Sequence, residues 1–234
     1  MFERQLKATR AAAEVLLIAL GILLGLMAES WLEQRGERAR EREYLETLTI
    51  EFANVRDELA SLVATENARI ELGEDLIRVS LTGEELPGES ILERLNDFHY
   101  YSFTVPPTVA VDQLIATGEL SLISSSSVRQ TLTRWHSRSQ VDIGLVQELF
   151  MDHWSHVGRE FWSSSMNMSD LYLANSERDL GIGTSASDQS RMFGTPEFRN
   201  WVAGRLMHSY DVNNIYINLL GIVESVQVEL VAAQ

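Results

Sequence analysis

The chain has 234 residues, of which 45% are hydrophobic, and a formal net charge of -15. The acidic excess lies after residue 44, where 27 acidic residues outnumber 12 basic ones, and such a surface repels nucleic acid and anionic head groups. The absence of cysteine excludes disulfides, thiolate metal sites and cysteine nucleophiles, but it does not fix the compartment.

The first segment after a basic tail at residues 1–10 is apolar from Ala11 to Ala28, interrupted only by Glu14. At about 1.5 Å per residue it covers most of a hydrocarbon core roughly 30 Å thick, and Trp31 follows at the position of an interfacial anchor. A cleaved secretory signal fits less well, because its apolar region is roughly 7–15 residues long. We therefore predict one transmembrane helix over residues 11–31.

One side of this predicted span carries small residues. Gly21 and Gly25 form a small-xxx-small pattern that lets helix backbones approach closely, although short apolar segments also acquire it by chance. Its expected partner is a transmembrane helix of another subunit, or a second copy of the chain through Gly21 and Gly25. The predicted partner-contact residues are Glu14, Ile18, Gly21, Gly25, Ala28 and Trp31, and the first five are called the contact stripe below.

Residues 32–44 alternate charges at helical spacing, which predicts a charged helical stalk with a possible hinge at Gly36. Basic residues flank the span on both sides, so the positive-inside rule leaves the orientation open. An apolar seam then begins, with steps of three and four that predict a long helix needing a partner. The seam residues are Leu45, Leu48, Phe52, Val55, Leu59 and Leu62, and the pattern continues to Leu81.

Helical spacing continues through the rest of the chain, and strand alternation is nearly absent. We expect helices over 90–101 and 109–116, the second closed by Gly118, and a longer one from the Ser124–Ser127 cap region to Phe161. A polar stretch, 163–195, exceeds ordinary loop length and is interpreted as partner-contacting or mobile. Thr195 and Pro196 then restart a helix. The predicted fold class is all-α, with residues 45–234 forming an acidic, extrinsic, antiparallel helical bundle.

The chain resembles a bacterial family of single-span membrane proteins of unknown function over roughly residues 11–160. The resemblance is carried by Glu14, Gly21, Trp31 and Tyr44-Leu45, and by a later segment containing Leu114, Gly118, Leu120, Ile123, Arg129 and Trp135. It implies a membrane-anchored helical domain and no assigned activity. The short amino-terminal tail, and Trp135-His136 where aromatic pairs are usual, depart from the family pattern. If basic tails in the family mark the cytoplasmic side, the resemblance places the bundle in the periplasm.

A ladder of polar side chains is the main candidate for metal chemistry. Glu148, Asp152, His156 and Glu160 recur every fourth residue, and His208 with Asp211 could face them from the last helix. The Glu-x-x-His pairs of a di-iron bundle are absent, so a solvated face is the competing interpretation. His153 falls on the apolar side and is interpreted as a core histidine; Trp135, Trp154, Trp162 and Trp201 are likewise expected in the core or at its edge.

The sequence lacks a phosphate-binding loop and a nucleophile elbow. We expect no catalytic residues and no cofactor, and a non-catalytic accessory subunit that docks on and stabilises a larger respiratory, photosynthetic or transport complex. An envelope sensor or ligand-binding module is the alternative, and a metal-dependent enzyme is the third hypothesis. The expected location is the bacterial inner (cytoplasmic) membrane, with one span and the bundle in the periplasm.

Overall fold

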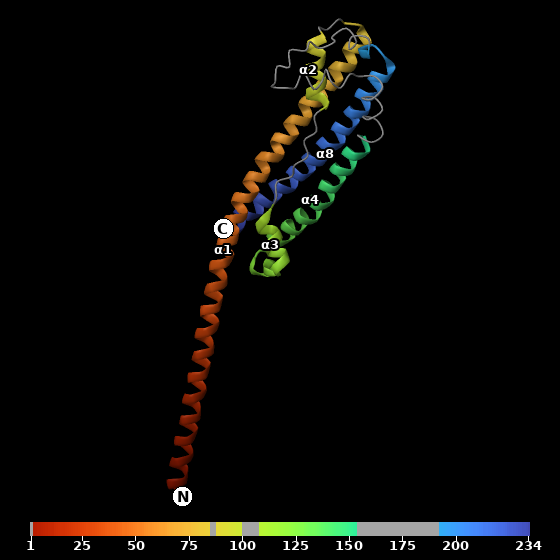
Figure 1. Ribbon diagram of the computed structural model, residues 1–234. Helices are drawn as coiled ribbons and strands as arrows, with labels where there is room; N and C mark the ends of the chain where they lie inside the picture. The colour runs from red at the N-terminus through yellow and green to blue at the C-terminus, as the bar shows by residue number, and fades with distance from the viewer. Residues whose placement is uncertain (1, 85–87, 100–107, 154–191) are drawn as a thin grey trace, which may run out of the picture.

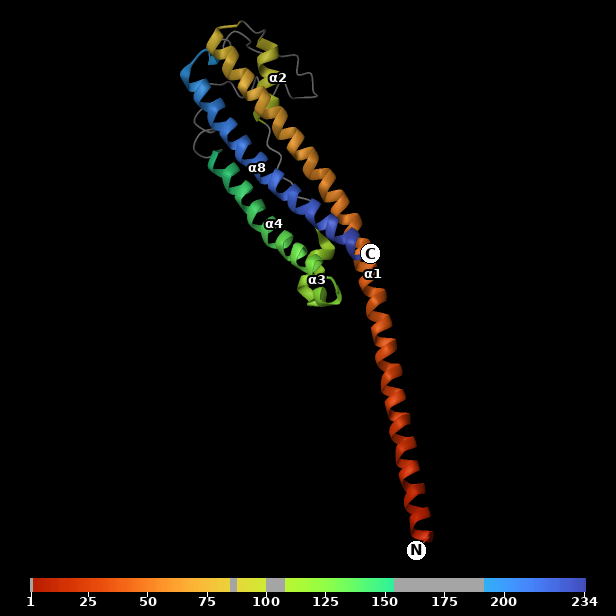
Figure 2. The same ribbon diagram turned by 180° about the vertical axis from the view of Figure 1, so that it is seen from behind.

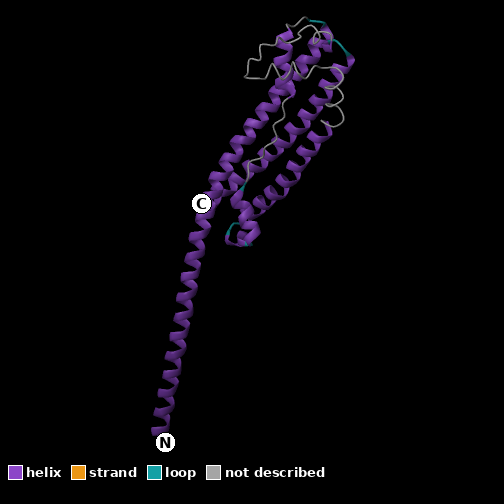
Figure 3. Cartoon of the chain, in the orientation of Figure 1, coloured by secondary structure: helices purple, strands orange, loops and turns teal. Residues whose placement is uncertain are grey.

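The computed structural model describes residues 2–84, 88–99, 108–153 and 192–234. Every element in these ranges is helical, as Figure 3 shows, which confirms the predicted all-α class. The elements are α1 (Phe2–Thr82), α2 (Gly88–His99), α3 (Val109–Thr117), the short 3-10 helix η1 (Glu119–Leu122), α4 (Ser126–His153) and α8 (Pro196–Ala233).

Helix α1 is 81 residues long and continuous. Its amino-terminal half projects away from the other helices, and its carboxyl-terminal half packs among them (Figure 1). The predicted stalk, 32–44, is part of this same helix, and Gly36 lies within it without a break. The segment before residue 40 and the packed domain are therefore joined by uninterrupted helix, which fixes their relative rotation.

Helix α8 lies against α1 and runs in the opposite direction, and α4 lies along α8 (Figures 1 and 2). Three hydrogen bonds show the opposite directions of the two segments, because the residue number rises along α1 while it falls along α8 and its last neighbour, Gln234. They join Thr49 to Gln234, Asn67 to Asn213, and Ser80 to Arg199.

Helix α8 runs antiparallel to α1 and to α4, and α4 runs in the same direction as α1 (Figure 1). The reason is that the chain returns to the start of the packed part of α1 before α4 begins. There the Ser124 amide donates to the Glu41 carboxylate at 2.6 Å.

The main hydrophobic core lies between the middle of α1, α3, α4 and the second half of α8. All six predicted seam residues of α1 are buried in it, which confirms that seam. Phe52 and Trp135 meet edge to face, with ring centroids 5.7 Å apart. Val128, Leu132 and Val146 on α4 are buried there too.

A second core cluster lies where α1 ends and α8 begins. It contains Phe198 and Trp201, and also Met192 and Phe193 from the predicted polar stretch. That prediction was therefore wrong for the last residues of 163–195, because Met192 and Phe193 are only 6% exposed and Ser80 Oγ donates to the Phe193 carbonyl at 2.5 Å. Residues 163–191 lie outside the described ranges. The predicted start of α8 is confirmed, since the Phe198 amide donates to Thr195 Oγ1 at 3.2 Å.

The predicted short helix is α3, and Gly118 ends it in the left-handed conformation, at φ +75°. Its amino-terminal end is capped from α1, because the Ala110 amide donates to Glu51 at 3.0 Å. Burial raises the pKa of the Glu51 carboxyl, and the backbone hydrogen bond opposes that rise. Trp135 Nε1 donates to Thr108 Oγ1 at 3.0 Å, which satisfies the buried indole.

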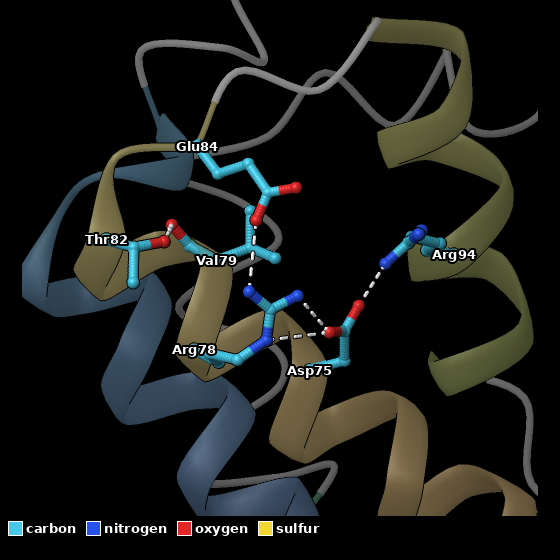
Figure 4. A network of polar contacts seen from close by, with 6 residues as sticks. All are labelled: Asp75, Arg78, Val79, Thr82, Glu84 and Arg94. Carbon is cyan, nitrogen blue, oxygen red and sulfur yellow. Dashed lines mark hydrogen bonds and ion pairs between the residues drawn. The ribbon is translucent and has the colours of Figure 1, made fainter.

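Helix α2 is tied to α1 by a charged network, shown in Figure 4. The Asp75 carboxylate accepts from Arg78 on its own helix, with 2.5 Å between Oδ1 and Nη2, and from Arg94 on α2. Arg78 also contacts Glu84 at 3.0 Å. The hydrogen bonds from Arg78 and then Arg94 lower the pKa of Asp75, so the carboxylate is the favoured form at neutral pH.

Candidate membrane and partner interface

Two helices in the described ranges are long and apolar enough to cross a membrane by length and composition, namely α1 and α8. They differ in their surroundings. The apolar window of α1 has no buried residue, and its large side chains between Leu16 and Met27 are 50% to 70% exposed. Helix α8 instead supplies fourteen buried residues to the packed domain. Within the described ranges, the amino-terminal part of α1 therefore carries an apolar surface with no buried side chain, whereas the exposed apolar side chains of α8, such as Met207 and Val228, lie on a helix that is partly buried.

The structure leaves the described part of the contact stripe uncovered. Ile18 is 64% exposed, Ala28 is exposed, and a Cβ added at Gly21 or Gly25 would meet no atom within 4 Å. The side chain of Glu14 lies outside the described residues. The described part of the contact stripe is therefore exposed, and its small residues would let a second helix approach closely.

Trp31, the last predicted partner-contact residue, stands where the apolar segment gives way to the charged one. Its side chain is exposed, and the Arg35 guanidinium carbon lies 5.4 Å from its ring centroid. A shallow cleft of about 520 Å³ begins at this tryptophan and follows one side of α1. The cleft is lined by Trp31, Gln34, Arg35, Arg38, Glu41 and Arg42.

The structure does not assemble the metal candidates in its described part. Glu148 and Asp152 are exposed on α4, as expected of a solvated face, while His208 is buried on α8. Among the residues described, no three histidine or carboxylate side chains come close enough together to hold a metal ion. His156 and Glu160 lie outside the described ranges, as does the side chain of His153. Of the four tryptophans expected in the core or at its edge, Trp135 and Trp201 are buried, and Trp154 and Trp162 lie outside those ranges.

A buried polar layer separates the two core clusters and was not predicted. Glu66 and Arg69 on α1 form an ion pair there, and Asn213 Nδ2 on α8 donates to Asn67 Oδ1 at 2.8 Å. Glu66 Oε2 is buried without a hydrogen-bond partner within the described ranges. The sequence signal was available, because Glu66 and Arg69 occupy seam positions that apolar residues fill earlier in the helix.

Two groups in the packed domain have pKa values that their surroundings shift. Burial raises the pKa of Tyr216 to about 12, and the Glu66 charge adds to that rise. Burial also lowers the pKa of His99 to about 4, with a further contribution from the Arg205 charge. Both groups are therefore held neutral near pH 7, which is the state that costs least to bury.

A groove of about 450 Å³ opens beside this layer, where α2 crosses α1. It is lined by Thr65, Ala68, Arg69, Leu72, Asn96 and Asp97. The volume falls within the range of small-molecule sites, and the Arg69 guanidinium is its buried cationic group.

Comparison with protein-family models, curated proteins and solved structures finds no match to this chain. The resemblance carried by Glu14, Gly21 and Trp31 therefore stays a prediction. The functional argument rests on the geometry described above.

Proposed function

We propose that the protein is a non-catalytic accessory subunit, anchored by one span over residues 11–31, that docks on and stabilises a larger membrane complex. The observation that carries the proposal is the division of α1 into two halves. The part from Leu45 to Leu62 is buried in the domain core, while the large apolar side chains from Leu16 to Met27 are exposed. Such a surface is stable in lipid or against another protein, and costly in water.

The contact stripe supports a protein partner as well as lipid. Gly21 and Gly25 have no side chains, and the space beside them is open. A second helix can therefore approach the α1 backbone closely there and gain van der Waals contacts. By its spacing Glu14 shares this side of the helix, and a carboxylate within a span favours a protein or aqueous environment over acyl chains.

Docking through the contact stripe would also orient the packed domain, since one helix contains both. Because α1 is unbroken from the stripe to the α1–α8 core, a partner that fixes the stripe also fixes the rotation of the domain above the membrane. The acidic domain is then presented to the extrinsic part of the complex. We place the anchor in the bacterial inner membrane and the domain in the periplasm, with respiratory, photosynthetic and transport assemblies as the host classes.

The test is extraction of the full chain from its native membrane in mild detergent, followed by mass spectrometry of the intact assembly. The proposal predicts a stoichiometric complex with other membrane subunits. Recovery of an isolated monomer, or of a homodimer joined through Gly21 and Gly25, would overturn the accessory-subunit role.

The groove between α1 and α2 favours a second candidate function, a ligand-binding or sensor module. In that case the free protein would gain thermal stability from a small molecule, because a ligand that binds only the folded state raises the melting temperature. Loss of that gain on Ala68→Trp substitution, which places a large side chain in the groove and keeps the Glu66–Arg69 pair, would locate the ligand there.

A further inference from the structure

We propose that Trp31, Arg35, Arg38 and Arg42 form a binding row for the phosphate groups of anionic phospholipids at the membrane surface. The inference deepens the proposed function and rests on the span over residues 11–31. These four residues recur at steps of four, three and four, so they share one side of α1. They also line the cleft of about 520 Å³ that begins at the end of the apolar segment.

The charges on this part of α1 are segregated by side. Glu29, Glu33 and Glu37 recur every fourth residue away from the row, and Glu41 at the cleft edge accepts from the Ser124 amide at 2.6 Å. Within the described ranges, no carboxylate lies at ion-pair distance from Arg35, Arg38 or Arg42. By contrast, Arg40 on another side of the helix lies 3.8 Å from Glu119. The guanidinium groups of these three arginines are therefore available to bind an anion from outside the chain.

The row side chains lean toward the predicted membrane. Helical side chains point toward the amino-terminal end of their helix, and here that end carries the apolar segment. Two contacts show the lean: the Arg35 guanidinium lies over the Trp31 ring at 5.4 Å, and Arg42 Nε donates to the Arg38 carbonyl at 3.3 Å. The guanidinium groups thus lie closer to the end of the apolar segment than their own backbone does.

The distances suit head groups. If hydrocarbon ends at Ala28, Arg35 is roughly 10 Å and Arg38 roughly 15 Å beyond it along the helix, and a head-group layer is about 5–8 Å thick. With their backward lean, Arg35 and Arg38 reach phosphates directly. Arg42, roughly 21 Å beyond, acts across about one screening length. Guanidinium forks bind phosphate oxygens in pairs, and the Trp31 ring is suited to the interface.

The test uses the full chain in bilayers, with Met27→Cys carrying a fluorophore. Met27 lies one turn before Trp31 on the same side, and the chain has no other cysteine. Quenching by brominated phosphatidylglycerol is compared with quenching by brominated phosphatidylcholine. We expect phosphatidylglycerol to be preferred at least fivefold, since each basic residue near an anionic surface contributes about that factor.

Replacement of the three row arginines by glutamine should bring the preference close to one. The matched control Arg40→Gln/Arg56→Gln/Arg134→Gln removes the same charge elsewhere and should keep it. Among single variants, Arg35→Gln should lose most and Arg42→Gln least. Inorganic phosphate added at constant ionic strength should leave the preference unchanged.

The outcomes separate the two proposals. Equal quenching by both lipids shows the span in place and the row without lipid selectivity, which overturns this inference alone. Absence of quenching by either lipid shows no span, which overturns the proposed function and the row with it. Equal loss in the row and control variants assigns the preference to net charge, and displacement by inorganic phosphate assigns the row to a soluble anion; either result contradicts a lipid site.

Discussion

Glu66 and Arg69 form an ion pair that is enclosed where α1 meets α8, with side chains only 4% and 8% exposed. The pair lies between the two hydrophobic clusters, at positions on α1 that apolar residues occupy earlier in the helix. A buried pair of this kind contributes little net stability, because the cost of desolvation offsets the attraction, yet each partner depends on the other.

Removal of one member of this pair should destabilise the domain more than removal of both. Arg69→Met leaves the Glu66 carboxylate buried without its cation, and we expect a loss of about 3–5 kcal/mol in the free energy of unfolding. Glu66→Leu/Arg69→Met should recover most of that loss. Chemical denaturation of the three proteins in the same detergent measures it, and a double variant no more stable than Arg69→Met would contradict this account.

Gly73 on α1 lies where side chains of both α2 and α8 pack against the helix. A Cβ added there would lie 2.6 Å from Phe98 Cε2 on α2 and 3.1 Å from Leu206 Cδ1 on α8. Gly73→Ala should therefore cost about 1–3 kcal/mol from overpacking, which exceeds the gain of about 1 kcal/mol in helix propensity.

The matched control is Gly221→Ala on α8, where a Cβ meets nothing within 4 Å. It should stabilise the protein by up to about 1 kcal/mol, since only the propensity gain applies. Thermal unfolding of both variants checks the opposite signs. A stabilising Gly73→Ala would show that α2 does not pack on α1 as described.

His99 predicts a pH dependence of stability on the acid side. Its pKa is about 4 in the folded chain, lowered by burial and by the charge of Arg205, against an ordinary value of 6.5. The unfolded chain therefore binds the proton first, and stability is lost as the pH falls from 6.5 to 4. With its partial exposure we expect this group to account for about 2 kcal/mol. His99→Gln should flatten the curve of unfolding free energy in that window, and an unchanged curve would show that His99 is not held neutral.

The sequence predicted a helix and its buried side well where apolar residues repeat regularly at steps of three and four. Leu45 to Leu62 on α1 and Val128 to Trp135 on α4 repeat at steps of three and four, and burial followed that repeat. Local chemistry likewise predicted the Thr195 cap and the Gly118 terminator. These features depend on neighbouring residues only, which a sequence displays directly.

Features that depend on packing between distant segments were missed. Met192 and Phe193 are adjacent apolar residues at the end of the polar stretch, but their burial depends on α8 folding back over α1, which local spacing does not predict. Helix α4 runs parallel to α1 because α3 and Ser124 bind near the start of the packed part of α1, where α4 begins. For the candidate interface, spacing alone predicted the contact stripe and Trp31, whereas the unpaired state of the row arginines needed three-dimensional positions.

The central claim is tested most directly by substitutions in the contact stripe of the native protein. Gly21→Leu/Gly25→Leu places two large side chains on the stripe, and Leu23→Phe/Met27→Phe places them on another side of the same helix. Mild-detergent extraction followed by mass spectrometry then counts the subunits that remain bound. The account predicts loss of the partner subunits in the first variant and retention in the second; full retention with leucine at both glycines would contradict docking through the stripe.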